Sequence, residues 1–302
     1  MYIAGDPSPP KGDDRTEECQ EWIIWNSGNC DRRRSRWTAT PSFFFESRAH
    51  GEALARLLYL VADQGMGMGM LTGEIGAGKT ITLSVLKNRL RRDLYQVSYI
   101  RTASLRFSDL LQEINLQLRE GPGQNGPPSV NGGTDPYRLL KEFEDLLDRR
   151  LRPMGKHFVL ILDEAQLLDP KCLEEVKCLT NLNQDGRRCL TIILAGQPEL
   201  RENLRLMPQI YQRLGIVFHL LNLSRDELAP YVTHRLSVAG SPRQDVFEDA
   251  CLDELYVFSG GCPRQVNRIC KLAVDRACLL QKTMVDADMV RMIIADIRKY
   301  FG

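Results

Sequence analysis

Apolar positions follow two different spacings along the first two thirds of this sequence. In the stretch 40–63 they recur every three or four residues, with Leu54, Leu57, Leu58 and Val61 on one face, which predicts an amphipathic helix. Other stretches are apolar at almost every position over the length of a strand, which is typical of parallel strands buried on both faces. Two such runs lie within 157–168 and 189–200.

Strand-like and helix-like segments alternate as far as residue 223, and only helix-like segments follow. This order predicts an α/β fold, a parallel sheet with helices on both faces, followed by a small all-helical lid. A capping box formed by Ser224 and Glu227 marks the first lid helix. Strands are predicted within 65–71, 96–102, 157–168, 189–200 and 215–223, and helices within 40–63, 81–94, 104–118, 137–151, 171–186 and 224–240. The predicted domains are 1–38, a flexible arm, 39–223, the sheet domain, and 224–302, the lid.

Two segments carry no such pattern. Residues 1–38 are dominated by Pro, Gly, Asp and Arg and contain the three tryptophans of the chain. Because chain termini are commonly mobile, we favour a flexible arm over an arm that folds on binding a partner. Residues 119–136 are rich in Gly, Pro and Asn, which predicts an exposed, mobile loop.

The most specific motif is GEIGAGKT at residues 73–80, which fits the pattern G-x-x-x-x-G-K-[ST] in full. Glycine lets the backbone wrap closely around phosphate, and the helix that follows adds the positive end of its dipole. We expect Lys79 to reach the β- and γ-phosphates of ATP and the Thr80 hydroxyl to ligate Mg²⁺. A structural glycine-rich turn is the alternative, and the strand before and the helix after the motif disfavour it.

A second signal is the apolar run FVLIL, which ends in Asp163 and Glu164. Ligands of open α/β sheets bind at the carboxyl ends of the strands, so both acids are expected beside the glycine-rich loop. Asp163 would hold Mg²⁺, directly or through water, and Glu164 would polarise the attacking water. The chain between Lys79 and Asp163 has room for two further strand–helix units. Two solvated acids after a core strand are the alternative.

Three more residues are candidates for the γ-phosphate, each with a simpler alternative. Gln197 follows an apolar strand, where it would orient water, or else belongs to an ordinary strand-to-helix turn. Arg213 precedes the strand within 215–223, where it would stabilise transition-state charge in a neighbouring subunit's site, or else forms a surface salt bridge. Arg264 begins a lid helix, and a cation is unfavourable there, which favours a role over the γ-phosphate rather than simple solvation.

Composition narrows the classes of function. The 302 residues are 43% hydrophobic and 26% charged, as in ordinary globular proteins, and the net charge of +1 gives no overall signal for nucleic acid. The nine cysteines include no CxxC pair, which favours buried thiols such as Cys270 and Cys278 in a reducing compartment over a metal site. No apolar run spans a bilayer and no secretory signal is present, so we expect a cytoplasmic protein without an integral membrane segment.

Five motifs, in this order, resemble those of AAA+ ATPases of the general secretion pathway protein A (ExeA) type, to which transposition regulators of the TnsC type are related. They are MLTGEIGAGKT, VLILDEAQLL, ILAGQPEL, QRLGIVFHL and SGGCPRQVN. The resemblance covers nearly all of the chain after residue 40 and implies that adenine lies between FFFESRAHGEAL and the lid. The roles implied by position are Walker A for Lys79 and Thr80, Walker B for Asp163 and Glu164, sensor 1 for Gln197, an arginine finger for Arg213 and sensor 2 for Arg264.

The sequence departs from this family in two respects. It ends just after the lid, whereas proteins of the ExeA type continue into a membrane span and a peptidoglycan-binding region, so the resemblance implies an ATPase more directly than a secretion or cell-wall role. The strand before the glycine-rich loop reads GMGMGML rather than bulky and branched, which predicts a less stable strand.

The predicted site combines residues for catalysis, for ATP binding and for Mg²⁺ binding. Catalysis is assigned to Glu164, Lys79, Gln197, Arg213 and Arg264; binding of ATP to Gly73, Glu74, Ile75, Gly76, Ala77, Gly78, Lys79, Thr80, Ile81, Asp163 and Arg264; and binding of Mg²⁺ to Thr80 and Asp163.

The leading interpretation is an ATPase that assembles with copies of itself and uses ATP to remodel or recruit a protein partner that the sequence does not identify. One alternative is a DNA-associated regulator of transposition, with Arg89, Arg91, Arg92 or the run 32–36 on duplex DNA, although a solvated helix end and arm are simpler. Another is a nucleotide-gated scaffold with little turnover, which Glu164 disfavours. A kinase or small-molecule transferase is less consistent, because nothing resembles an acceptor pocket.

Overall fold

The structure is a computed structural model that describes residues 41–301, apart from 64–65, 102–104, 121–134, 185–186, 242 and 244. The predicted arm, with its arginine run, and most of the predicted loop at 119–136 lie outside the described residues. The described chain forms two compact units. One unit is Glu46–Asn222, and the other comprises Leu223 onward together with the described residues up to Phe45.

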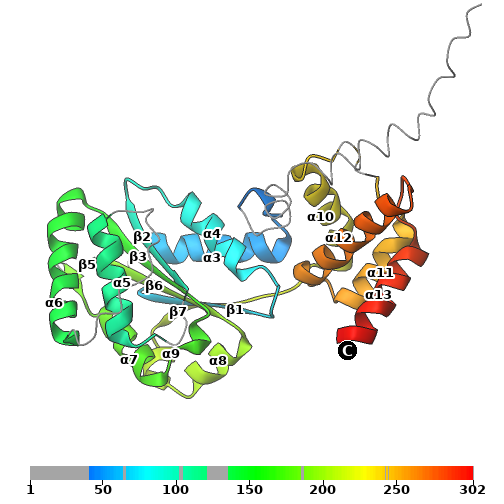
Figure 1. The fold of residues 1–302 in the computed structure, drawn as a ribbon. Helices are drawn as coiled ribbons and strands as arrows, with labels where there is room; N and C mark the ends of the chain where they lie inside the picture. The colour runs from blue at the N-terminus through cyan, green and yellow to red at the C-terminus, as the bar shows by residue number, and fades with distance from the viewer. Residues whose placement is uncertain are drawn as a thin grey trace, which may run out of the picture. The chain divides into compact units, whose positions relative to one another are not determined.

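The larger unit contains a parallel five-stranded sheet in the order β2-β3-β6-β1-β7 (Figure 1). Helices α3 and α4 lie on one face of the sheet, and α7, α8 and α9 lie on the other. The predicted α/β fold with helices on both faces is therefore confirmed. The strands are β1 (Met68–Gly73), β2 (Tyr95–Arg101), β3 (His157–Asp163), β6 (Leu190–Gly196) and β7 (Leu214–Leu220); the helices are α3 (Arg48–Ala62), α4 (Lys79–Arg89), α5 (Phe107–Glu120), α6 (Pro136–Leu146), α7 (Pro170–Leu179), α8 (Pro198–Arg205) and α9 (Pro208–Tyr211).

The central strands are buried over their whole length, as their apolar runs predict. Every residue of β1, β3 and β6 is buried. In β1 the glycines make close packing possible: a methyl group on Gly69 would collide with the Leu60 side chain of α3, while Met68 and Met70 join the core on the other face. The glycine-rich strand thus allows α3 to lie close to the sheet.

Between the glycine-rich loop and β3, the described residues form β2, α5 and α6, as the predicted strand within 96–102 and the two predicted helices require, and α6 packs against α5. Two details of the predicted elements are wrong. The helix expected over 171–186 ends at Leu179, and the chain continues into a short antiparallel pair, β4 (Asn183–Gln184) with β5 (Arg187–Arg188). The helix expected to reach residue 94 ends at Arg89, where Leu90 is extended.

The smaller unit is helical, which confirms the helical region predicted after the sheet. Glu227 accepts a hydrogen bond from the Ser224 backbone at 3.0 Å, so this half of the predicted capping box is formed. The Phe43 ring lies 4.3 Å from the Arg235 guanidinium. The helices of this smaller unit are α10 (Arg225–Val238), α11 (Asp249–Ser259), α12 (Pro263–Leu279) and α13 (Ala287–Phe301). Across both units, none of the helices within the described ranges is long and apolar enough to cross a bilayer.

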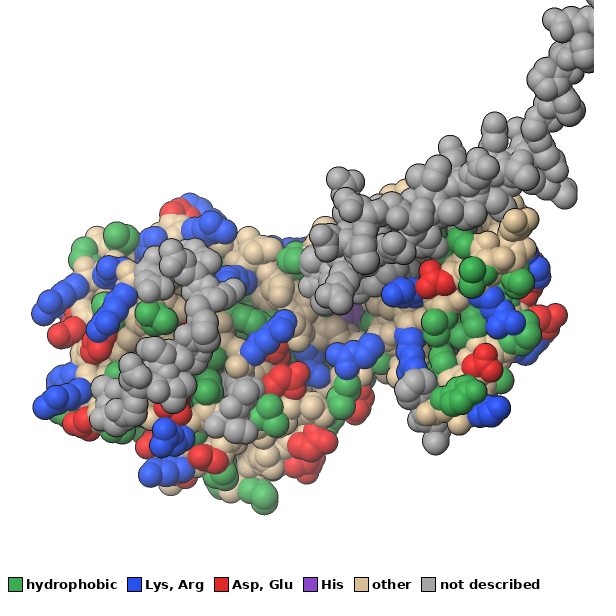
Figure 2. All heavy atoms as spheres, in the orientation of Figure 1, with side chains coloured by type: hydrophobic (Ala, Val, Ile, Leu, Met, Phe, Trp, Pro, Cys, Tyr) green, Lys and Arg blue, Asp and Glu red, His purple; other side chains and the backbone are tan. Residues whose placement is uncertain are grey.

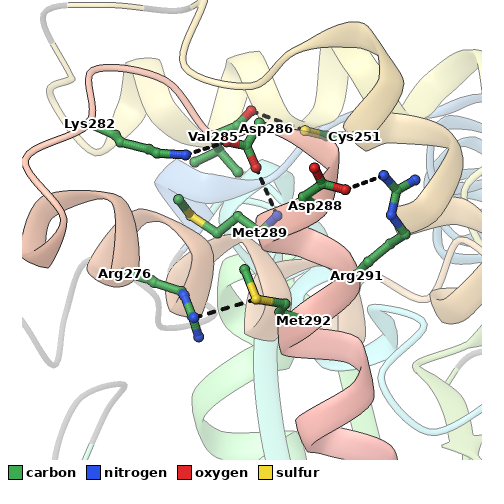
Figure 3. Close-up of polar contacts among 9 residues, drawn as sticks. All are labelled: Cys251, Arg276, Lys282, Val285, Asp286, Asp288, Met289, Arg291 and Met292. Carbon is green, nitrogen blue, oxygen red and sulfur yellow. Dashed lines mark hydrogen bonds and ion pairs between the residues drawn. The ribbon is translucent and has the colours of Figure 1, made fainter.

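The last helix of this unit starts at a side-chain cap (Figure 3). The Asp286 carboxylate accepts hydrogen bonds from the Met289 backbone at 2.8 Å and from Lys282 at 2.6 Å. These two donors hold the pKa of Asp286 below its usual value, and Lys282 is the larger cause.

Burial raises the pKa of the Cys270 thiol to about 12, so this cysteine is the buried, unreactive thiol that its helical position predicts.

Candidate nucleotide-binding site

The glycine-rich loop connects β1 to α4 and owes its shape to glycines at three positions. Gly76 and Gly78 have φ angles of 90° and 107°, in the left-handed region that side chains disfavour. Gly73 ends β1, where a Cβ atom would lie 2.8 Å from the Leu220 carbonyl oxygen of β7. The first α4 residue is Lys79, so the unpaired N–H groups of a helix start lie at the end of the loop. This is the backbone geometry that accommodates phosphate.

Lys79 lies across the loop that precedes it. Its side chain is buried, and its ammonium donates to the carbonyl oxygens of Gly73 at 2.6 Å and Glu74 at 3.0 Å. These two carbonyl oxygens hold the Lys79 ammonium beside the glycine-rich loop, and a phosphate can replace them as hydrogen-bond acceptors. The neighbouring Ile75 is 57% exposed, so this part of the loop is open to solvent.

His50, in the first turn of α3, contacts the backbone of the glycine-rich loop, a contact that no motif of the sequence predicted. Its Nε2 lies 3.0 Å from the Ala77 carbonyl oxygen and its Nδ1 lies 2.6 Å from Ser47 Oγ. Ser47 Oγ accepts from the His50 backbone, so its own proton is available for Nδ1, which leaves Nε2 as the donor to Ala77. A Cβ on Gly78 would lie 2.6 Å from Nε2, which explains why this contact requires glycine.

Asp163 lies at the end of β3, beside Thr80 as expected from the topology. The Thr80 hydroxyl donates to Asp163 Oδ2 at 2.9 Å, which leaves the lone pairs of its oxygen for a cation. A hydroxyl and a carboxylate in this arrangement fit Mg²⁺, which prefers oxygen ligands and retains several waters. Thr80 and Asp163 are thus the residues that would hold the ion, directly or through water, and the bound ion would neutralise phosphate charge.

Tyr99, on the neighbouring strand β2, is a further site residue that the sequence analysis missed. Its hydroxyl donates to the same oxygen, Asp163 Oδ2, at 2.6 Å. Burial first, and then the negative charge of Asp163, raise the pKa of Tyr99 well above its usual value. The phenol therefore remains a proton donor, and its acceptor keeps a fixed orientation.

Glu164 follows Asp163 in the left-handed backbone region, with φ of 58°. Its carboxylate accepts a hydrogen bond from Gln166 Nε2 at 2.7 Å, and Gln166 Oε1 accepts from the Gln197 backbone at 3.1 Å. The structure therefore brings the acid predicted to polarise water close to the residue predicted as sensor 1. The link is Gln166, which the sequence analysis did not single out, although it is the fourth residue of the DEAQ segment.

Arg213 lies at the opposite end of the sheet from the glycine-rich loop. It precedes Leu214, which pairs with the first residue of β1, whereas the loop follows Gly73, the last residue. Six strand residues at about 3.3 Å each separate these ends by about 20 Å. The exposed Arg213 guanidinium donates to Thr180 Oγ1 at 2.9 Å and Asn181 Oδ1 at 2.6 Å, beside a pocket of about 270 Å³.

Two further residues predicted to act on the γ-phosphate are Gln197 and Arg264. Gln197 is the N-cap residue of α8, and its side chain makes no capping hydrogen bond. Arg264 is the second residue of α12 and belongs to the smaller unit, so its role over the γ-phosphate stays a prediction, as does adenine binding between FFFESRAHGEAL and the lid.

This chain is similar in sequence to known proteins. Residues 62–204 match the family described as AAA domain. General secretion pathway protein A of Aeromonas hydrophila is 39% identical over 243 residues, which cover 78% of this chain and 42% of that protein. This chain thus spans less than half of the length of that relative.

Among solved structures, similarity lies at the level of the fold. The ORC2 protein of Aeropyrum pernix, solved as ADPNP–ADP complexes, has a TM-score of 0.60 at 19% identity, covering 84% of this chain and 71% of that one. The Aeropyrum pernix ORC1 protein in complex with DNA has a TM-score of 0.62 at 17% identity, covering 87% and 69%.

Proposed function

Because this chain belongs to the AAA+ family of ATPases and is similar to General secretion pathway protein A, we propose that it binds ATP with Mg²⁺ and hydrolyses it. The observation that supports this most directly is the Thr80–Asp163 hydrogen bond, which joins the glycine-rich loop to the acidic end of β3. That bond brings the loop, the Asp163 carboxylate and the adjacent Glu164 together at one edge of the sheet, which supports a site for phosphate and a cation there.

Lys79 and the N–H groups at the start of α4 bind the β- and γ-phosphates. Thr80 and Asp163 would hold Mg²⁺, which would neutralise phosphate charge. Glu164 accepts hydrogen bonds from the attacking water and takes up its proton as the γ-phosphoryl group is transferred. The Gln197 backbone is linked to this acid through Gln166, which supports a role for Gln197 in sensing the γ-phosphate.

Arg213 extends the proposal to self-assembly. At about 20 Å from its own loop, as the strand length requires, its guanidinium completes a site only in a neighbouring copy. Hydrolysis at such interfaces would move the lid according to the state of the nucleotide. This movement would remodel or recruit a protein partner.

The experiment that tests the function compares two variants with the native chain. Lys79→Ala should abolish ATP binding in isothermal titration with Mg²⁺, because the loop loses its ammonium. Glu164→Gln should retain ATP but release phosphate about 10²-fold more slowly, the scale of a positioned general base. Native turnover in Glu164→Gln would contradict the mechanism, and undetectable turnover in the native chain would favour a nucleotide-gated scaffold.

Duplex DNA is the second candidate partner, because a structure of similar fold, Aeropyrum pernix ORC1, was solved in complex with DNA. Two of the arginines near the end of α4 that were considered for this role form ion pairs, Arg89 with Glu46 and Arg91 with Asp93. Basic and acidic side chains are interspersed on the face shown in Figure 2. A titration of duplex DNA at several salt concentrations distinguishes the partners: log affinity that falls steeply with log salt supports the DNA-associated regulator.

A further inference from the structure

The Gln166 side-chain amide uses both of its ends to join Glu164 to the Gln197 backbone. It lies in the short helical turn Ala165–Leu167 that follows Glu164. Its Nε2 donates to Glu164 Oε2 at 2.7 Å, and its Oε1 accepts from the Gln197 backbone at 3.1 Å. One end must donate to a carboxylate and the other must accept from an N–H, so the orientation of the amide is fixed by both partners.

The backbone around Gln166 preserves these two contacts. The left-handed conformation of Glu164, with φ of 58°, turns the chain so that residues 164 and 166 lie side by side. A methyl group on Gly196, at the end of β6, would collide with Gln166 Oε1. The glycine of the AGQP segment is therefore required for the amide to reach the start of α8.

We propose that Gln166 is a positioning residue that holds the Glu164 carboxylate and ties it to the backbone at Gln197. A displacement of Gln197 toward or away from a γ-phosphate then moves the acid with it, so that Glu164 is oriented for water activation only when the end of β6 is in place. The inference rests on the proposed function, since it requires Glu164 to act on water.

Gln166→Ala removes both hydrogen bonds, and Gln166→Glu keeps the shape and the acceptor but places a second carboxylate against Glu164. Both variants should bind ATP with a dissociation constant within about twofold of the native value and hydrolyse it about 10- to 100-fold more slowly, as expected for a misplaced catalytic group. Gln166→Glu also serves if the alanine variant does not fold. Amide exchange at Gln197 in the nucleotide-free protein should rise in Gln166→Ala and stay protected in Gln166→Glu.

The chain offers a matched control in Gln117. Its amide also joins two elements, accepting from Ser98 of β2 at 2.6 Å and donating to Glu113 of its own helix α5 at 2.7 Å, and neither partner is among the residues proposed to bind or hydrolyse ATP. Gln117→Ala should leave hydrolysis unchanged, which shows that the loss of a bridging amide is not sufficient to slow the reaction.

A double-mutant cycle decides between positioning and general structural damage. In a Glu164→Gln background, Gln166→Ala should cause no further loss of the residual rate, because its effect passes through Glu164. Additive losses, or native turnover in both Gln166 variants, would overturn the inference. Native turnover in Glu164→Gln alone would instead overturn the proposed function, so the two failures are distinguishable.

Discussion

Tyr99 and Asp163, 64 residues apart in sequence, are joined by a 2.6 Å hydrogen bond from the phenol to Oδ2. The same oxygen accepts the Thr80 hydroxyl. One carboxylate oxygen therefore receives a donor from β2 and a donor from the start of α4, which fixes the carboxylate beside the glycine-rich loop. In the proposed role of Asp163 as a Mg²⁺ ligand, such partners would set its orientation and raise its affinity for the metal.

Tyr99→Phe should raise the Mg²⁺ concentration needed for half-maximal ATP hydrolysis by about tenfold, since removal of an outer-shell partner costs about 10- to 100-fold in affinity or activity. The ring stays in place, so ATP binding without Mg²⁺ should not change. Because the pKa of Tyr99 is raised above its usual value, the phenol stays protonated from pH 6 to pH 9, and the effect should be the same across this range. A magnesium titration at both pH values measures it, and an unchanged magnesium requirement would argue against an orienting role.

His50→Ala should weaken ATP binding by about tenfold, or about 1.4 kcal/mol. The Ala77 carbonyl oxygen would lose its donor at 3.0 Å, and the left-handed turn at Gly78 would lose the ring beneath it. His50→Gln carries an N–H donor of similar reach and should restore part of the affinity. Isothermal titration with ATP compares the three proteins; equal affinities would show that the loop keeps its shape without this support.

Local features of the site were predictable from sequence because they depend on local chemistry. Gly76 and Gly78 take backbone angles that favour glycine, and Asp163 ends a strand whose apolar run marks it as buried. Parallel pairing then brings the strand ends together at one edge of the sheet. The glycine-rich loop, the pair Asp163 and Glu164, and the alternation of strands and helices all follow from such short patterns.

Contacts between distant residues were not predictable in this way. His50 and Ala77 lie 27 residues apart, and Gln166 and Gln197 lie 31 apart, so no spacing in the sequence indicates that they meet. Helix ends were also missed where side chains compete with the helix: Thr180 Oγ1 donates to the Lys177 carbonyl at 2.7 Å just beyond the last residue of α7.

The cap of α13 gives a prediction about stability and pH. Asp286→Ala should destabilise the protein by about 1 kcal/mol at pH 7, the usual cost of losing an N-cap side chain. The pKa of Asp286 is lowered in the folded state, so this stabilisation is complete above the unfolded value of about 3.9 and is lost as the pH falls through the lower folded value.

Urea unfolding of the native and Asp286→Ala proteins at pH values from 3 to 7 tests this. Their difference should be constant from pH 5 to pH 7 and shrink below about pH 4. Asp288→Ala is the matched control, because Asp288 pairs with Arg291 on the exposed surface nearby (Figure 3) and should matter much less. A difference between native and Asp286→Ala that grows toward acid would contradict the assignment.

Arg213 leads to the prediction about assembly. Thr180 and Asn181 hold its guanidinium at the amino end of the sheet, on the opposite side from its own loop. If the residue completes a neighbour's site, specific activity should rise with protein concentration, since a monomer lacks the finger. Arg213→Ala should still bind ATP but lose about 10³- to 10⁵-fold in hydrolysis, the scale of an arginine supplied in trans.

Mixing two inactive variants separates action in trans from a surface role. Arg213→Ala retains the nucleotide site, and Lys79→Ala retains the finger, so a mixed interface that joins one to the other is complete and should recover part of the activity. Arg205→Ala, at an exposed arginine paired with Glu202, should stay fully active alone and controls for loss of surface charge. A mixture of Arg205→Ala and Lys79→Ala should show no more activity than the Arg205→Ala protein shows alone. Specific activity that stays flat on dilution, with no recovery in the Arg213→Ala and Lys79→Ala mixture, would leave Arg213 as a surface residue bound to Thr180 and Asn181.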